Sequence, residues 1–273
     1  MSSSGQTGWL HMRPLGHSTY AIDDNGRDMM YLVAGGERCA VIDTGFGIGD
    51  LASLVAEVTV LPVIVVNTHG HVDHVSGNGA FSVAYVGEGD LPGVSSLPPE
   101  EMRQGIRQRF ANDPLLKAFN WDTWGMRVAG KIVPIKDGHV FDLGNRTLEV
   151  ISLPGHTPGS LCLLDRSTRF LFTGDSIHGG TLWLHLRDSL PLHKFHDHLV
   201  HLRSYAAEFD TLLPGHAKPE NLPLPAKTLD DLIAGIELIL AGELVGRPET
   251  TFVGDGLRCD FASCGILYRP DRL

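Results

Sequence analysis

Residues 68 to 74 read Thr-His-Gly-His-Val-Asp-His, which places four potential metal ligands within six positions. They follow Leu61 to Val66 (LPVIVV), a short apolar run rich in β-branched residues that predicts a strand buried on both faces. A chain that turns sharply there, with Gly70 giving freedom of backbone angle, can aim the first two histidines at one metal ion and the Asp-His pair at a second. The alternative is a chance gathering of polar residues on an exposed loop, which this spacing directly after a buried strand disfavours.

Four further residues of metal-ligating type stand at the ends of other strand-like runs. They are Asp43 after Val41-Ile42, His156 after Leu148 to Leu153, Asp175 after Phe170 to Thr173, and His216 after Thr211 to Leu213. Small or turn-forming residues stand beside each of them, which lets the backbone approach closely around an ion. We therefore expect both halves of the chain to deliver ligands to one metal site.

These segments, taken in order, resemble the five signature segments of the metallo-β-lactamase superfamily of binuclear metallohydrolases, over about residues 30 to 217. The resemblance implies three ligands for each metal and one bridge. The first metal would be held by His69, His71 and His156, the second by Asp73, His74 and His216, and Asp175 would bridge the two. It also implies that Asp43 lies outside the metals and orients the metal-binding loop, as carboxylates behind metal ligands commonly do.

The expected fold is α/β, a four-layer αβ/βα sandwich of the metallo-β-lactamase type. We expect residues 1–17 to form a flexible N-terminal tail and residues 18–273 to form a single domain. A helical excursion is predicted at about residues 91–127, where prolines are followed by an amphipathic stretch and then by several aromatic residues. Those aromatic side chains are expected to pack onto the core, and the alternative is that the excursion forms a wall of the substrate pocket.

Hydrophobic patterning and turn residues place the remaining elements. Strands are expected in hairpins over 18–43, at 83–86, 139–143, 147–153, 160–164, 169–173 and 211–213, and as a final pair within 250–270. Helices are expected at 49–58, 193–209 and 227–244.

Composition agrees with one enzyme domain, because 273 residues with 42% hydrophobic content can bury a sizeable core. No run of eighteen apolar residues occurs, and the first twenty residues lack the apolar stretch of a secretory signal, so we expect a cytoplasmic protein without a membrane partner. The four cysteines are few and scattered, which favours reduced, buried thiols.

The formal charge of -10 argues against a nucleic-acid partner, since such proteins normally carry a basic face that neutralises phosphates. Two metal dications can still make a cleft locally positive on an acidic protein. No stripe of lysine or arginine is present, however, and a small-molecule substrate is therefore preferred.

The expected chemistry follows from two adjacent dications, because a water molecule that bridges them loses a proton near neutral pH. The resulting hydroxide can attack an electron-poor carbonyl carbon or a phosphorus, and Asp73 could accept and relay a proton. Histidine and carboxylate ligands without thiolate favour two zinc ions, with iron or manganese as alternatives. No Ser-His-Asp nucleophile is needed.

Asp175 narrows the choice of reaction within the superfamily that this chain resembles. True β-lactamases of that superfamily generally lack the bridging aspartate, whereas thioesterases, lactonases and phosphodiesterases have it, so β-lactam hydrolysis is disfavoured. We therefore predict hydrolysis of a small ester, thioester or lactone. Glyoxalase II enzymes share the metal ligands, but their C-terminal basic residues for glutathione are not recognisable in Leu224 to Leu273.

Two other activities are compatible with the same ligand set. A phosphodiesterase of the same superfamily and a persulfide dioxygenase with one iron are the alternatives, and metal count and type separate the latter from a hydrolase. Flavodiiron proteins are excluded, since they usually carry Glu in place of His71 and have a flavin domain. A non-catalytic binding module is disfavoured because it would be expected to have lost ligands.

Six histidines fall between residues 178 and 201. His178 is the one predicted to act in catalysis, because it follows Asp175 by three positions and its loop must pass the open face of the metals. Its expected role is substrate orientation or oxyanion stabilisation. The alternative is a solvent-exposed loop residue.

Overall fold

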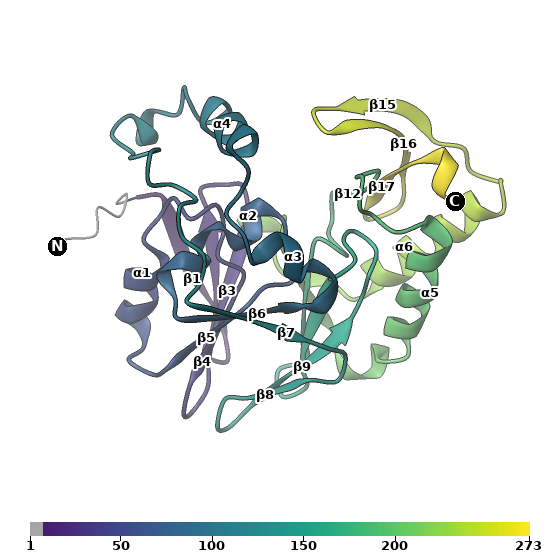
Figure 1. Cartoon of the computed structure of the whole chain (residues 1–273). Coiled ribbons are helices and arrows are strands. Elements are labelled where there is room, and N and C mark those ends of the chain that lie inside the picture. The colour runs from purple at the N-terminus through teal and green to yellow at the C-terminus, as the bar shows by residue number, and fades with distance from the viewer. Residues whose placement is uncertain (1–7) are drawn as a thin grey trace. The chain divides into compact units, whose positions relative to one another are not determined.

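The computed structural model describes residues 8–273, which form two compact units (Figure 1). The first unit consists of the residues up to Val86, Leu91–Ile135 and Leu143–Asn145. The second consists of Gly87–Asp90, Lys136–Asp142 and Arg146–Leu273. A single domain over residues 18–273 stays a prediction.

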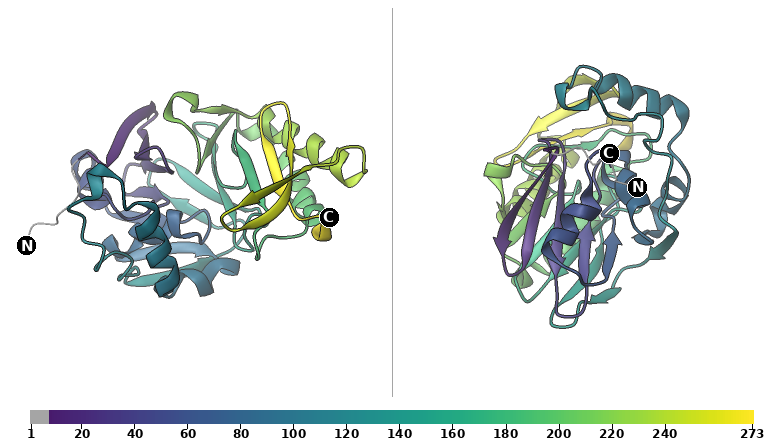
Figure 2. Two further views of the ribbon diagram at one scale, coloured as in Figure 1. Left: turned by 90° about the horizontal axis from the view of Figure 1, so that it is seen from above. Right: turned by 90° about the vertical axis from the view of Figure 1, so that its left-hand side faces the viewer.

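The first unit is built on a seven-stranded sheet in which the strands lie in chain order. Its strands are β1 (Leu10–Gly16), β2 (Thr19–Asp24), β3 (Met29–Ala34), β4 (Cys39–Ile42), β5 (Val63–Val66), β6 (Val83–Gly87) and β7 (Lys131–Ile135). Strands β1 to β4 pair antiparallel, and β4, β5 and β6 pair parallel. The purple strands of the N-terminal hairpins lie side by side in the right-hand view of Figure 2. Because β4 and β5 are parallel, the polar residues after them emerge at the same edge of the sheet.

Short helices complete the first unit. They are α1 (Leu51–Val58), α2 (Val72–Val75), η1 (Ser76–Ala80), α3 (Leu91–Val94), α4 (Glu100–Arg109) and η3 (Pro114–Leu116). Helix α1 begins where the Asp50 carboxylate accepts a hydrogen bond from the Ser53 amide at 3.1 Å, which satisfies an N-terminal donor. Its buried residues Leu51 and Val55 pack with the strand residues of the sheet.

The aromatic residues of the helical excursion pack inward, as predicted. Phe110 and Trp124 are buried in a cluster with Trp9 and Phe46. The Trp124 indole donates a hydrogen bond to the Phe46 carbonyl at 2.6 Å, so the polar edge of the ring is satisfied as well. Burial of these rings ties the excursion to the core of the first unit.

The predicted N-terminal tail is wrong for residues 10–16, which form β1, while residues 1–7 lie outside the described residues. Pro14 and the neighbouring Arg13 hid the strand character of this segment, but an edge strand tolerates proline because one side of its backbone is not paired. Trp9, which precedes the strand, is fully buried, and its indole donates a hydrogen bond to Asp24. These contacts hold the segment against the hairpin that follows it.

The second unit contains two sheets. The six-stranded sheet has the order β14 (Leu224–Pro225), β13 (Thr211–Pro214), β11 (Phe170–Gly174), β10 (Leu161–Asp165), β9 (Thr147–Ser152) and β8 (Val140–Asp142). The four-stranded sheet has the order β12 (Thr181–Leu184), β17 (Gly265–Tyr268), β16 (Gly254–Asp260) and β15 (Arg247–Thr251). The predicted final pair of strands is therefore wrong in number. Three C-terminal strands form and β12 joins them, because β12 pairs in parallel with β17 from the far end of the chain.

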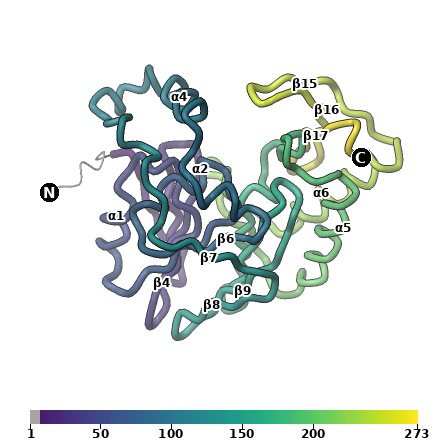
Figure 3. The backbone as a smooth tube through the Cα atoms, in the orientation of Figure 1, coloured from purple at the N-terminus to yellow at the C-terminus, as the bar shows by residue number. Residues whose placement is uncertain are grey.

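Helices α5 (Leu192–Arg203) and α6 (Lys227–Leu240) lie side by side in the second unit (Figure 3). The 3-10 turns η2 (Glu88–Asp90), η4 (Ala206–Glu208), η5 (Pro219–Asn221) and η6 (Pro270–Arg272) complete it. Apolar residues of both helices form one core with residues of both sheets, Phe195 and Ile236 being fully buried. Among residues 8–273, no helix has the length and apolar character needed to cross a membrane.

Candidate metal centre

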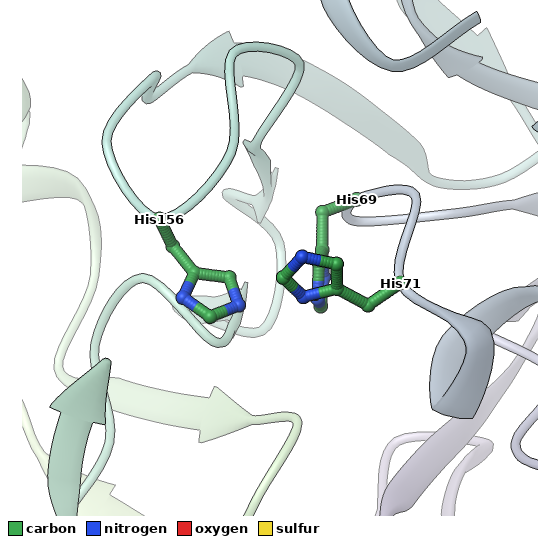
Figure 4. A group of neighbouring side chains, drawn as sticks. All are labelled: His69, His71 and His156. Carbon is green, nitrogen blue, oxygen red and sulfur yellow. The ribbon is translucent and has the colours of Figure 1, made fainter. Parts of the chain in front are cut away.

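The loop after β5 presents His69 and His71 toward each other (Figure 4). Nε2 of His69 lies 3.1 Å from Nδ1 of His71. Two nitrogens that each lie about 2.0–2.1 Å from one tetrahedral ion are separated by roughly 3.3 Å, so this spacing fits two ligands of a single ion. His69 is buried and His71 is half-buried.

Asp73 and His74 stand on α2, a single helical turn that the sequence patterns did not predict. The turn brings both side chains close to Asp28, a residue that was not predicted from the sequence. One ligand atom from each of Asp28, Asp73 and His74 lies within 4.8 Å of the others, and all three belong to the first unit. Asp28 stands in no recognisable motif, so nothing in the sequence alone identifies it.

Asp43 contacts the ligand loop in the way that a positioning role requires. Its carboxylate accepts hydrogen bonds from the Thr68 amide and the Thr68 hydroxyl, each at 2.7 Å. Its Oδ2 also lies 2.9 Å from Nδ1 of His74, which directs the other nitrogen of that ring away from Asp43. Asp43 has a backbone φ of 60°, a conformation that is costly for a residue with a side chain.

Asp43 also affects a nearby tyrosine. Burial and then the Asp43 carboxylate raise the pKa of Tyr31 well above its ordinary value, so Tyr31 stays neutral.

In the second unit, Asp175 lies between two histidines. Its Oδ2 is 3.0 Å from Nε2 of His216 and 3.5 Å from Nε2 of His156. Asp175 and His156 are buried, whereas the His216 side chain is about one-third exposed. A single carboxylate oxygen thus faces two imidazole nitrogens, which is the arrangement that a bridging ligand needs.

The loop that carries His156 (Figure 4) comes after β9 in the chain and is held by contacts that the sequence did not indicate. Nδ1 of His156 donates a hydrogen bond to the Trp183 carbonyl on β12 at 2.7 Å, which leaves Nε2 with its lone pair for a metal. Asp90 accepts hydrogen bonds from the Thr157 hydroxyl at 2.6 Å and from the Gly159 amide at 2.8 Å. A side chain at Gly159 would collide with the Asp90 backbone, so this close approach requires glycine.

His178 is buried, so the alternative of a solvent-exposed loop residue is wrong. Its ring centroid lies 6.1 Å from that of His216. The Gly180 amide donates to Nδ1 of His178 at 3.1 Å, and an imidazole that accepts at Nδ1 carries its proton on Nε2. His178 is therefore a neutral ring with a donor N–H beside a candidate ligand.

The predicted ligands fall into two sets, one in each unit. The first unit presents His69, His71, Asp73 and His74, and the second presents His156, Asp175 and His216. Within each unit the residues come together with nitrogen and carboxylate donors in the mixture that zinc, iron and manganese accept. That the two sets share one binuclear centre stays a prediction.

Residues 26–216 match the family model described as the metallo-beta-lactamase superfamily. The chain belongs to this superfamily. In solved structures, the fold is similar to a metallo-beta-lactamase from Pontibacter korlensis (TM-score 0.58, 16% identity, 84% of this chain and 99% of the other). It is also similar to a metallo-beta-lactamase family protein from Thermus thermophilus (TM-score 0.57, 19% identity, 89% and 84%). The predicted α/β fold of the metallo-β-lactamase type is confirmed.

Two curated relatives are similar to this chain, one over about three-quarters of its length and the other over about half. The acyl-coenzyme A thioesterase MBLAC2 of Gallus gallus is 28% identical over 234 residues, which are 76% of this chain and 80% of the relative. The hydroxyacylglutathione hydrolase GloC of Haemophilus influenzae is 29% identical over 150 residues, which are 53% and 63% of the two chains. Together with the family match, these relatives confirm the prediction of a metal-dependent hydrolase of this superfamily.

Proposed function

We propose that the protein hydrolyses a small-molecule thioester at a binuclear metal centre. The observation that carries the proposal is the naming of several curated relatives. These are named as thioesterases or hydrolases for three different carriers, coenzyme A, glutathione and acyl carrier protein, and the thioester is the bond that these substrates share. The proposal therefore concerns the reacting bond, and experiment must decide between the small-molecule carriers coenzyme A and glutathione.

The proposed centre joins the two ligand sets. One ion would be held by His69, His71 and His156, and the other by Asp73, His74 and His216, with Asp175 between them. The facing nitrogens of His69 and His71 and the position of Asp175 between two histidines support this assignment. Two dications in such a site supply a hydroxide nucleophile near neutral pH and a Lewis acid for the carbonyl oxygen. Zinc suits these donors best, with manganese or iron as alternatives.

Protein groups carry out the remaining steps. Nε2–H of His178 is a neutral donor suited to the oxygen that gains negative charge when the thioester carbon becomes tetrahedral. Asp73 would accept a proton after attack and pass it to the departing thiolate. Asp43 and Asp90 would each hold one ligand loop in place through hydrogen bonds, so that neither loop must reorganise during the reaction.

The setting that we propose is a reducing compartment such as the cytoplasm. All four cysteines among the described residues are buried and free. Burial raises the pKa of each thiol, and that of Cys264 reaches about 11, so these side chains stay protonated and unreactive. The formal charge of -10 supports a small substrate over a nucleic acid.

The experiment combines metal analysis with a substrate panel. Protein purified without added metal is analysed for zinc, iron and manganese per chain. It is then supplied with acyl-coenzyme A and acylglutathione thioesters, matched oxygen esters, a lactone and a phosphodiester, with release of free thiol monitored for the thioesters and of acid for the others. We expect about two ions per chain and fastest turnover of a thioester, abolished by a chelator, restored by added zinc or manganese, and absent in His71→Ala.

Two results would contradict the proposal. Faster turnover of the oxygen ester, lactone or phosphodiester than of every thioester would move the activity to another branch of the superfamily. About one iron per chain, with oxygen uptake on glutathione persulfide, would instead identify a dioxygenase.

A further inference from the structure

Asp28 places a carboxylate beside two predicted metal ligands although it belongs to none of the five motif segments. It directly precedes β3, is 2% exposed, and has a ligand oxygen within 4.8 Å of ligand atoms of Asp73 and His74. All three residues lie in the first unit. The contact therefore depends only on how the β2–β3 hairpin meets the turn of α2.

The hairpin fixes the backbone of Asp28 firmly. The Asp24 amide donates to the Asp28 carbonyl at 2.9 Å, and the Arg27 amide donates to the Asp24 carbonyl at 3.2 Å. Asn25 and Gly26 have φ values of 53° and 75°, the conformations that a tight hairpin turn requires. The side chain of Asp28 thus starts from a defined backbone position, as a residue that binds a metal must.

Charge explains why such an arrangement would be useful. Two buried or half-buried carboxylates, those of Asp28 and Asp73, stand within 4.8 Å of each other and repel. A dication between two carboxylates this close converts their repulsion into binding. His74 adds its Nε2, because Nδ1 of the same ring already faces Asp43. These three groups form a compact donor set for one divalent ion.

We propose that Asp28 is a further carboxylate ligand of the ion that Asp73, His74 and His216 would hold. This inference rests on the proposed binuclear function and makes its two metal positions chemically different. Asp175 would serve both positions, but the position of His69, His71 and His156 is otherwise all nitrogen, whereas the second position adds carboxylates from Asp28 and Asp73. Oxygen-rich sites suit manganese and iron(II) better than nitrogen-rich ones do, so the second position favours these harder ions.

The test is metal titration of the full-length apo protein, wild type against Asp28→Asn. Asparagine keeps the size of the side chain and removes its charge. Zn²⁺ and Mn²⁺ are titrated separately by calorimetry, and the Co²⁺-loaded forms are compared by visible absorption, which responds to the number and type of ligands. Asp23→Asn is the matched control, because Asp23 lies on the same hairpin and its carboxylate accepts from the Gly26 amide in the exposed turn.

We expect Asp28→Asn to weaken binding of the second ion. Loss of a supporting contact costs roughly 10–100-fold in affinity, and loss of a direct ligand should cost at least as much, with a greater loss for Mn²⁺ than for Zn²⁺. The first ion should bind with unchanged affinity, and the Co²⁺ spectrum should change only for the second ion. Asp23→Asn should match the wild type in all three measurements. Thermal midpoints of the apo proteins show whether the hairpin still folds.

Binding of both ions to Asp28→Asn with wild-type affinities and spectra would overturn the inference. Equally weakened binding of both ions, together with a lower thermal midpoint of the apo protein, would also overturn it, since Asp28 would then only support the fold. The readout does not use thioester turnover. An inactive wild type that still binds two ions, the second through Asp28, would refute the thioesterase proposal and leave this inference standing.

Discussion

Oδ2 of Asp175 lies 3.0 Å from Nε2 of His216. The same oxygen lies 3.5 Å from Nε2 of His156, although these two histidines follow different strands, β13 and β9. One carboxylate oxygen therefore faces the nitrogens proposed to serve two different ions. This geometry favours a bridging role for Asp175 over a ligand role at a single ion.

Asp175→Asn should reduce the metal content from about two ions per chain to one or none, with loss of hydrolysis, because the amide cannot bridge two cations as a carboxylate does. Elemental analysis of protein purified side by side provides the measurement. Asp210→Asn is the matched control, since Asp210 is an exposed carboxylate of the second unit that pairs with Arg169. Full metal content and full rate in Asp175→Asn would show that the bridge assignment is wrong.

Asp43→Asn should weaken metal binding by about 10–100-fold, which is the usual cost of losing a carboxylate behind a metal ligand. The substitution removes the negative charge beside Nδ1 of His74 and disturbs two bonds to Thr68. Competition with a chromophoric chelator gives the affinity. Thr68→Val removes only the hydroxyl bond and should have a smaller effect, so an equal or larger loss in Thr68→Val would contradict the proposed role of Asp43.

The motif residues could be proposed from the sequence because their segments follow short, strongly apolar strands. Such strands are recognisable locally, and their parallel pairing brings their C-terminal ends to one edge, as β4 and β5 show. Asp43 and His74, which follow these two strands, accordingly lie 2.9 Å apart.

Residues that act through long-range contacts could not be found in this way. Asp28 and Asp90 are single carboxylates outside any motif, and Asp90 reaches Thr157 across 67 residues of chain. Strand β12 was missed for the same reason, because its four residues are defined by pairing with β17 near the C-terminus. The carbonyl of Trp183 on that strand orients His156, and backbone groups carry no sequence signature.

Asp24 should make the stability of the protein depend on pH. Burial raises the pKa of Asp24 from 3.8 to about 6, even though hydrogen bonds from the Phe46 amide and the Trp9 indole lower it. The folded state therefore binds a proton more tightly than the unfolded state does. The resulting stabilisation is complete below about pH 4, falls as the pH rises from 4 to 6, and is absent above 6, a change of about 3 kcal/mol in the free energy of unfolding.

Urea unfolding of the apo protein at several pH values tests this expectation. Asp24→Asn should lose the dependence between pH 4 and 6, so that the difference in stability between wild type and variant changes by about 3 kcal/mol across this range. Altered hydrogen bonds to Phe46 and Trp9 would shift the free energy of unfolding of the variant by the same amount at every pH. They therefore do not affect the comparison of the two pH dependences. Parallel curves for wild type and Asp24→Asn would refute the assigned titration, and Asp23→Asn should retain the wild-type slope.

His178→Ala should lower kcat by about 10²–10³-fold without changing the metal content, because it removes a neutral donor suited to the developing oxyanion. This role requires the proton to be on Nε2 of His178, which follows from the Gly180 amide donating to Nδ1. His178→Gln places an amide N–H near the position of Nε2–H and should restore part of the rate. His201→Gln is the control, since His201 is an exposed residue of α5. Wild-type turnover of the thioester by His178→Ala, or a loss of metal in that variant, would remove His178 from the catalytic step.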